Sequence, residues 1–177
     1  MARKGELVNT LFEERLFELV GVLHRIARTF EAERIPYELV GGLVVLVHVE
    51  EANPEHSTLT RDVDLMVDRV DLDRIKEASA KAGVDTVLGG QVARAPDAVR
   101  LVFSGERTGT AVRKRILGTE VMVAPVAELL RTSLSSFGDK DRVLVRSMDA
   151  AGLITSQVEQ TLPEELAARL RVVRETE

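Results

Sequence analysis

The stretch VGGLVVLVHVEEANPEHSTLTRDVDLMVD, residues 40–68, decides how the rest of the chain is interpreted. It opens with the glycine pair Gly41 and Gly42, continues through an apolar run and a polar loop, and ends in a second apolar run that contains Asp62 and Asp64. Residues two apart in a β-strand point to the same face of the sheet. We therefore expect the two aspartates to lie side by side, while the apolar residues between and after them face the core.

Two neighbouring carboxylates repel each other, and burying them without a partner is costly. A divalent cation removes both costs, because Mg²⁺ is commonly held by one or two carboxylates together with water and substrate phosphates. Asp62 and Asp64 thus indicate metal-assisted phosphoryl chemistry. The alternative is that both side chains lie at an exposed strand end, or pair with Arg61 or Arg69.

The glycine pair is a second feature suited to phosphate. The run that follows it, 43–49, fits either a strand or a buried helix. If it is a helix, its N-terminus offers free backbone N–H groups, and glycine lets a phosphate approach them closely. The alternative is an ordinary strand-to-helix turn. The loop before Asp62 adds side chains that can contact phosphate oxygens or simply cap and solvate the loop: Ser57, Thr58, Thr60 and Arg61.

Periodicity along the chain predicts an α/β (α+β) domain. Helices are predicted over 7–33, 71–82, 126–137, 139–154 and 162–175, and strands over 37–42, 62–68, 85–90, 98–105 and 118–125. We expect a sheet-containing core at 1–125 and a helical C-terminal extension at 126–177, packed together as one compact unit. A basic run, 112–117, places Arg113 and Arg115 on one face, which suits an acidic partner, RNA or solvent.

Composition narrows the classes of function. The 177 residues are 45% hydrophobic and 30% charged, which is enough apolar material for one core. The net charge of −5 argues against extended DNA binding through overall charge. The absence of cysteine excludes disulfides and thiolate metal sites. With no secretion-type segment and no long apolar run, we expect a cytoplasmic protein without a membrane partner.

The combination LVGG…LTRDVDLMV resembles the nucleotidyltransferase signature of the DNA polymerase β-like superfamily, and more closely that of bacterial nucleotidyltransferases of the AbiEii toxin type and their uncharacterised relatives. In that signature a strand, a glycine turn and a helix precede a strand that carries two aspartates. The segments 99–106 and 121–154 resemble the third core strand and the helical tail of this group. The resemblance covers roughly residues 30–172.

The resemblance implies a nucleotidyltransferase fold, in which a small mixed β-sheet is flanked by helices. It also implies Mg²⁺-dependent transfer of a nucleoside monophosphate from a nucleoside triphosphate to an unknown acceptor, which is a protein, an RNA or a small molecule. Asp62 and Asp64 would be the catalytic metal ligands. The nucleotide-binding residues would be Gly41, Gly42, Thr60, Arg61 and Lys140. A toxin–antitoxin partnership is a further implication.

The chain also departs from the family pattern. The third carboxylate expected on the next core strand is missing, since Leu101 and Val102 stand there, and the nearest acids are Asp97 and Glu106. Losing the general base it supplies costs a factor of about 10² to 10⁴ in rate. In the tail, Ser133, Gly138 and Leu144 replace a lysine, an arginine and a polar residue. These changes favour an alternative function, a catalytically degenerate nucleotide-binding or protein-interaction module.

Overall fold

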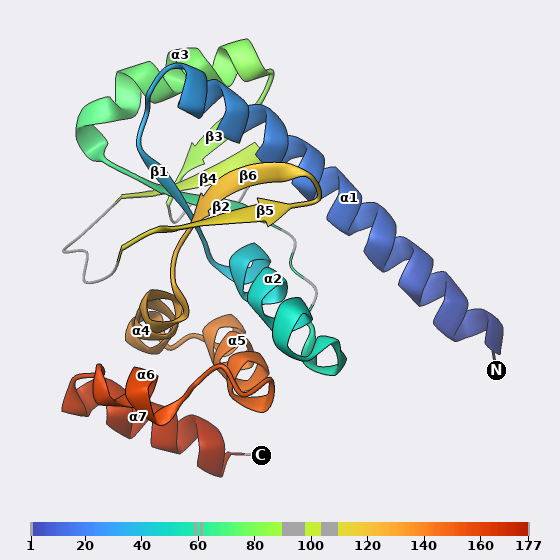
Figure 1. Cartoon of the computed structure of the whole chain (residues 1–177), viewed down its shortest axis with the longest axis vertical. Helices are drawn as coiled ribbons and strands as arrows, with labels where there is room; N and C mark the ends of the chain where they lie inside the picture. Colours follow the sequence, from blue (N-terminus) through green and yellow to red (C-terminus); the bar gives the residue numbers. More distant parts are fainter. Residues whose placement is uncertain (1, 59, 61, 90–97, 104–109, 177) are drawn as a thin grey trace.

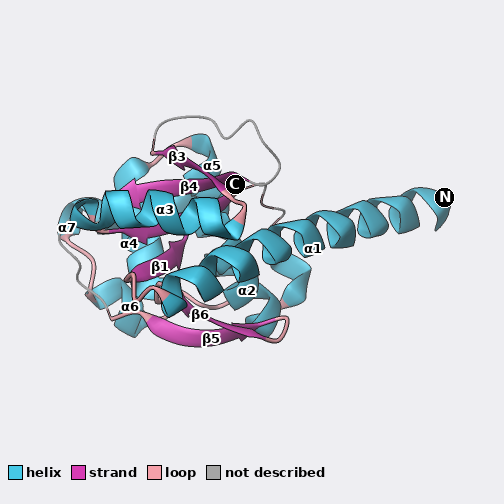
Figure 2. Ribbon diagram, turned by 90° about the horizontal axis from the view of Figure 1, so that it is seen from above, coloured by secondary structure: helices cyan, strands magenta, loops and turns pink. Residues whose placement is uncertain are grey.

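The computed structural model describes residues 2–58, 60, 62–89, 98–103 and 110–176, with side chains from residue 13 onward. The first element is a long helix, α1 (Ala2–Ala32), whose second half carries the buried side chains Leu23, Ile26 and Phe30. Its first half extends beyond the rest of the molecule (Figures 1 and 2). The helix predicted over 7–33 is confirmed and begins earlier than expected.

A six-stranded mixed sheet forms the centre, in the order β3-β4-β2-β1-β6-β5. Its strands are β1 (Tyr37–Val40), β2 (Val63–Val67), β3 (Asp85–Leu88), β4 (Ala98–Phe103), β5 (Val112–Ile116) and β6 (Thr119–Val123). The β1–β2 and β5–β6 pairs are antiparallel, whereas β1–β6, β2–β4 and β3–β4 are parallel. The five predicted strands are confirmed within the described residues, and the predicted strand positions 90, 104 and 105 lie outside them. Residues 112–116 of the basic run form a sixth strand that sequence patterns did not predict.

The run after the glycine pair is a helix, α2 (Gly42–Ala52), which settles the ambiguity over 43–49. Two single-turn 3₁₀ helices, η1 (Pro54–His56) and η2 (Arg69–Asp71), flank β2, and α3 (Leu72–Ala82) follows. Figure 1 shows three layers, with α1 and α3 over one face of the sheet and α2, α4 and α5 under the other. Both faces of β2 are therefore covered, and all five of its residues are buried.

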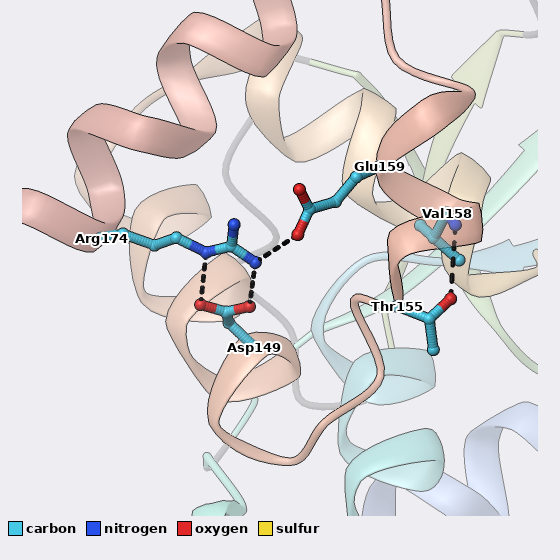
Figure 3. A network of polar contacts seen from close by, with 5 residues as sticks. All are labelled: Asp149, Thr155, Val158, Glu159 and Arg174. Carbon is cyan, nitrogen blue, oxygen red and sulfur yellow. Dashed lines mark hydrogen bonds and ion pairs between the residues drawn. The ribbon is translucent and has the colours of Figure 1, made fainter.

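Four helices complete the chain: α4 (Val126–Ser136), α5 (Asp139–Ala150), α6 (Ser156–Gln160) and α7 (Glu164–Glu175). The guanidinium of Arg174 on α7 donates to both carboxylate oxygens of Asp149 on α5, at 2.9 and 2.7 Å, and to Glu159 on α6 at 2.7 Å (Figure 3). The hydroxyl of Thr155 caps α6 by accepting the Val158 N–H at 3.3 Å. The predicted helices are confirmed, except that α5 ends at Ala150 and α6 is additional.

The predicted α/β class is thus confirmed as a mixed sheet covered by helices, while the nucleotidyltransferase fold in particular stays a prediction. The predicted boundary between residues 125 and 126 falls between β6 and α4. No helix in the described part of the chain is long and apolar enough to cross a membrane.

Candidate functional site

The turn between β1 and α2 is held tightly against β2. Gly41 has a φ of +74°, and a Cβ placed on it would lie 2.4 Å from Oδ2 of Asp64. A Cβ on Gly42 would lie 2.7 Å from Oγ1 of the buried Thr60. Any side chain at either position forces a neighbour to move. The absence of side chains at both positions therefore has a steric reason, and it lets the start of α2 lie against Asp64 and Thr60.

Asp64 is buried on β2, where its residue is 4% exposed. The strand predicted over 62–68 starts one residue later, at Val63, so Asp62 stands immediately before β2 with 28% of its side chain exposed. The apolar neighbours Val63 and Leu65 are buried in the core, as expected. The negative charge of Asp62 adds to the burial that raises the pKa of Asp64.

The partner of Asp64 comes from the neighbouring strand β4. Asp64 and Arg100 are register partners, and Nε of Arg100 donates to Oδ1 of Asp64 at 2.7 Å. Burial raises the pKa of the Asp64 carboxyl above its ordinary value, and the hydrogen bond and charge of Arg100 oppose that rise. The sequence-based alternative of Arg69 as partner is wrong, because its guanidinium lies over the ring of Phe103, 4.1 Å from the centroid.

The partner of Asp62 is Lys140, in the first turn of α5. Nζ of Lys140 donates to Oδ2 of Asp62 at 2.8 Å. Partial burial disfavours the charged carboxylate, but the hydrogen bond and charge of Lys140 outweigh it, so the pKa of Asp62 lies below its ordinary value. The Lys140 side chain remains 61% exposed. The structure thus gathers all the predicted site residues that it describes, whereas Arg61 lies outside the described residues.

A cleft of about 230 Å³ opens between the sheet and the C-terminal helices, beside Asp64. Its sheet wall comes from β1, β2, β4 and the end of β6, and its helical wall from α4 and α5. The lining residues are Val40, Gly41, Asp64, Met66, Arg100, Val102, Ala124, Leu129, Thr132, Ser133, Ser136, Asp141 and Leu144. A larger groove of about 500 Å³, between α1, α2 and the β5–β6 turn, is mostly apolar and contains none of the predicted site residues. We place the candidate site at the smaller cleft because Gly41, Asp64 and Arg100 line it, whereas the Asp62–Lys140 pair is not among its lining residues.

The third carboxylate of the family pattern is absent from the described part of β4. Leu101 is fully buried, and Val102 lines the cleft. The position beside Asp64 is occupied by Arg100, so a cation stands there instead of an acid. Asp97 and Glu106 lie outside the described residues.

Sequence reasoning missed the role of Arg100 at this site, and it named Asp141 only as a match, with Lys140, to the helical tail of the family. Arg100 is the one charged residue in the run AVRLVF, and a charge in a buried strand signals an opposite charge nearby. Asp141 on α5 lines the same cleft, and its charge contributes to raising the pKa of Arg100. Its carboxylate accepts the N–H of Gly138 at 3.2 Å, which fixes it at the start of α5.

The carboxylates of Asp62 and Asp64 are the metal donors to consider at this site. Within the described ranges, no group of three or more histidine, aspartate or glutamate side chains could hold a metal ion. Mg²⁺ bound to phosphates needs only one or two carboxylates from the protein. Asp62 and Asp64 would supply these carboxylates; Oδ1 of Asp64 bonds Arg100, and its Oδ2 lies against the glycine turn.

The fold and the site define an α/β protein with a charged cleft at the junction of its sheet and its C-terminal helices. Comparison of the chain with protein-family models, curated proteins and solved structures finds no match.

Proposed function

We propose that the chain is a nucleotidyltransferase that binds a Mg²⁺–nucleoside triphosphate at the start of α2 and transfers the nucleoside monophosphate to an acceptor. The observation that carries this proposal is the close approach of Asp64 to the glycine turn, where a Cβ on Gly41 would lie 2.4 Å from its Oδ2. A helix N-terminus, two oxygen donors and the lysine of α5 meet at one place. This combination suits a phosphate chain carrying a divalent cation.

Each residue has a separate task in this proposal. The backbone N–H groups at the start of α2 bind phosphate oxygens, and the glycine pair permits their approach. Asp62 and Asp64 hold the cation, which supplies charge neutralisation at the reacting phosphate. Lys140 transfers its contact from Asp62 to a phosphate oxygen as a mobile point charge, consistent with its exposure. Asp64, Asp141 and Arg100 are the charged residues that line the cleft, so carboxylates outnumber cations there and an incoming triphosphate needs its own metal to enter.

Calorimetric titration tests the binding step. Each of the four ribonucleoside triphosphates is titrated, with and without Mg²⁺, into the wild type, Asp62→Asn and Asp64→Asn. The matched control is Asp73→Asn, an exposed acid on α3. We expect Mg²⁺-dependent binding in the wild type and the control, weakened at least tenfold in both site variants. Binding that is equal in all four proteins, or absent from the wild type, would contradict the proposal.

A second function, nucleotide binding without transfer, is favoured by Arg100. A guanidinium beside Asp64 cannot act as the general base that a third carboxylate would supply. The two functions are separated by measuring pyrophosphate release from the preferred triphosphate, with water or an added protein or RNA as acceptor. Turnover that both aspartate variants abolish supports transfer, whereas saturable binding with no pyrophosphate release supports a binding module.

A further inference from the structure

Arg100 has hydrogen-bond donors that its contact with Asp64 does not use. A guanidinium has five N–H donors, and only Nε is used in the contact with Asp64. Among the described residues, no acceptor contacts the two terminal nitrogens. The side chain is 33% exposed and lines the cleft, so these donors are open to it. They form a planar fork of the kind that binds phosphate or carboxylate oxygens.

Ser133, on the opposite wall, is an independent sign of a ligand. Its residue is 6% exposed, it lines the cleft, and its hydroxyl makes no hydrogen bond with the described part of the chain. The neighbouring hydroxyls of Thr132 and Ser135 instead donate to the carbonyls of Glu128 and Arg131, at 2.9 and 2.8 Å. The Ser133 hydroxyl therefore keeps its donor and its acceptor capacity for a ligand.

The Ser133 hydroxyl is also open to the cleft. The one fully enclosed side-chain polar atom without a partner in the described residues is Nε of Arg142, not Oγ of Ser133. A ligand in the cleft can therefore reach this hydroxyl.

The space between these two polar groups is a slot with apolar walls. Met66 and Val102 form its sheet side, and Leu129 and Leu144 form its helical side. A slot between two apolar walls suits a flat, uncharged ring. Its volume of about 230 Å³ is below the range of roughly 300–1,000 Å³ that is typical of pockets for whole ligands. The slot therefore accommodates part of a nucleotide rather than all of it.

We propose that one nucleotide spans this cleft, with the phosphate nearest the sugar on Arg100 and the nucleoside in the slot, where it hydrogen-bonds to Ser133. This inference rests on the proposed nucleotide site and assigns it a part that needs no metal. Arg100 keeps its Nε contact with Asp64, so that carboxylate orients the fork toward the phosphate. Nucleoside monophosphates are then ligands in their own right, and Arg100 and Ser133 are binding residues.

The test titrates each of the four ribonucleoside monophosphates into the protein in the presence of EDTA. The variants are Arg100→Gln, Arg100→Lys and Ser133→Ala. The controls are Arg131→Gln and Ser135→Ala, which alter an arginine and a serine of α4 that do not line the cleft. We expect at least one monophosphate to bind the wild type and both controls. Binding should weaken at least tenfold in Arg100→Gln, less in Arg100→Lys, and about threefold to tenfold in Ser133→Ala.

Two further measurements separate the possible outcomes: the melting temperature of Ser133→Ala and the Mg²⁺ dependence of nucleotide binding. Ser133→Ala removes an unpaired hydroxyl, so its melting temperature should equal or exceed that of the wild type while its affinity falls. Monophosphate binding that is unchanged in Arg100→Gln and Ser133→Ala would overturn the inference. Absence of monophosphate binding in EDTA, alongside Mg²⁺-dependent triphosphate binding, would also overturn it and leave the proposed function standing. Monophosphate binding with these losses, but without any Mg²⁺-dependent triphosphate binding, would instead overturn the proposed function.

Discussion

Oδ1 of Asp64 accepts a hydrogen bond from Nε of Arg100 at 2.7 Å, directly across the parallel pair formed by β2 and β4. The contact joins two central strands through their side chains as well as their backbones. It also neutralises a carboxylate that burial disfavours in its charged form. The Asp64–Arg100 pair thus connects two strands of the sheet and fixes the positions of two side chains that line the candidate site.

Removing the arginine alone should destabilise the protein strongly. Arg100→Ala leaves the buried Asp64 carboxylate without a partner, and we expect the free energy of unfolding to fall by about 3 kcal/mol. The double variant Asp64→Asn/Arg100→Ala should recover part of that loss, because no unpaired charge remains. Urea denaturation of the two single variants and the double variant measures the coupling. Additive losses would show that the pair contributes no interaction energy.

Gly41 should tolerate no side chain. Gly41→Ala combines a φ of +74° with a Cβ 2.4 Å from Asp64, so we expect a loss of about 2–5 kcal/mol in stability. Gly83 is the matched control, since its φ is +65° and a Cβ there would have no neighbour within 4 Å. Gly83→Ala should cost about 1–2 kcal/mol, from the backbone conformation alone. Equal losses of unfolding free energy in the two variants, measured by thermal or urea unfolding, would show that the contact between β2 and the turn adds no cost to a side chain at residue 41.

The Asp62–Lys140 pair should make stability depend on pH in the acid range. The folded-state pKa of Asp62 is lowered from 3.8, so the pair stabilises fully above that value and loses its contribution as the pH falls through the folded-state pKa. Lys140→Ala should cost about 0.5–1 kcal/mol at pH 7. That difference should vanish in acid denaturation series. Lys76→Ala, an exposed lysine of α3, should show no such pH-dependent difference.

His48 should produce a second pH dependence, near neutrality. Burial, with the charge of Lys114, lowers its pKa below 6.5, against the opposing contact of its Nε2 with the Ala124 carbonyl at 3.3 Å. The neutral form is therefore favoured in the folded state, and stability should fall as the pH drops below 6.5. Between pH 7.5 and 5.5, the free energy of unfolding of His48→Gln should therefore fall less steeply than that of the wild type. Urea denaturation at several pH values measures the slope, and a wild-type slope in His48→Gln would contradict the assignment.

The hydrogen bonds of Arg174 should hold α5, α6 and α7 together. Arg174 contacts two helices through three hydrogen bonds, whereas the nearby Arg171 makes one exposed ion pair, with Glu164. Arg174→Ala should therefore lower the free energy of unfolding by about 1–2 kcal/mol and Arg171→Ala by less than about 0.5 kcal/mol. Hydrogen exchange should show faster opening of α7 in the first variant only. Equal hydrogen-exchange rates of α7 in the two variants would show that Arg174 does not hold α7 in place.

Sequence patterns predicted most elements because their signals are local. The alternation around Asp62 and Asp64 and the glycine pair placed β2 and the start of α2 at one site. β5 escaped prediction because its exposed face is basic and its hairpin turn is Leu117–Gly118, with both residues at positive φ, instead of an asparagine–glycine pair. The pairing of Asp64 with Arg100 depends on which strands are neighbours and in which register, and no local pattern specifies that.

The strand order also has a consequence for how the protein is made. β1 lies between β2 and β6, so its second neighbour is synthesised only after most of the sheet has left the ribosome. At roughly 5–20 residues per second, several seconds separate the synthesis of Val40 from that of Val123. During this interval one edge of β1, and the apolar run that becomes α2, have no final cover. The nascent chain is thus most exposed to aggregation and to chaperones before β6 arrives, and truncations that end before Val123 should be insoluble.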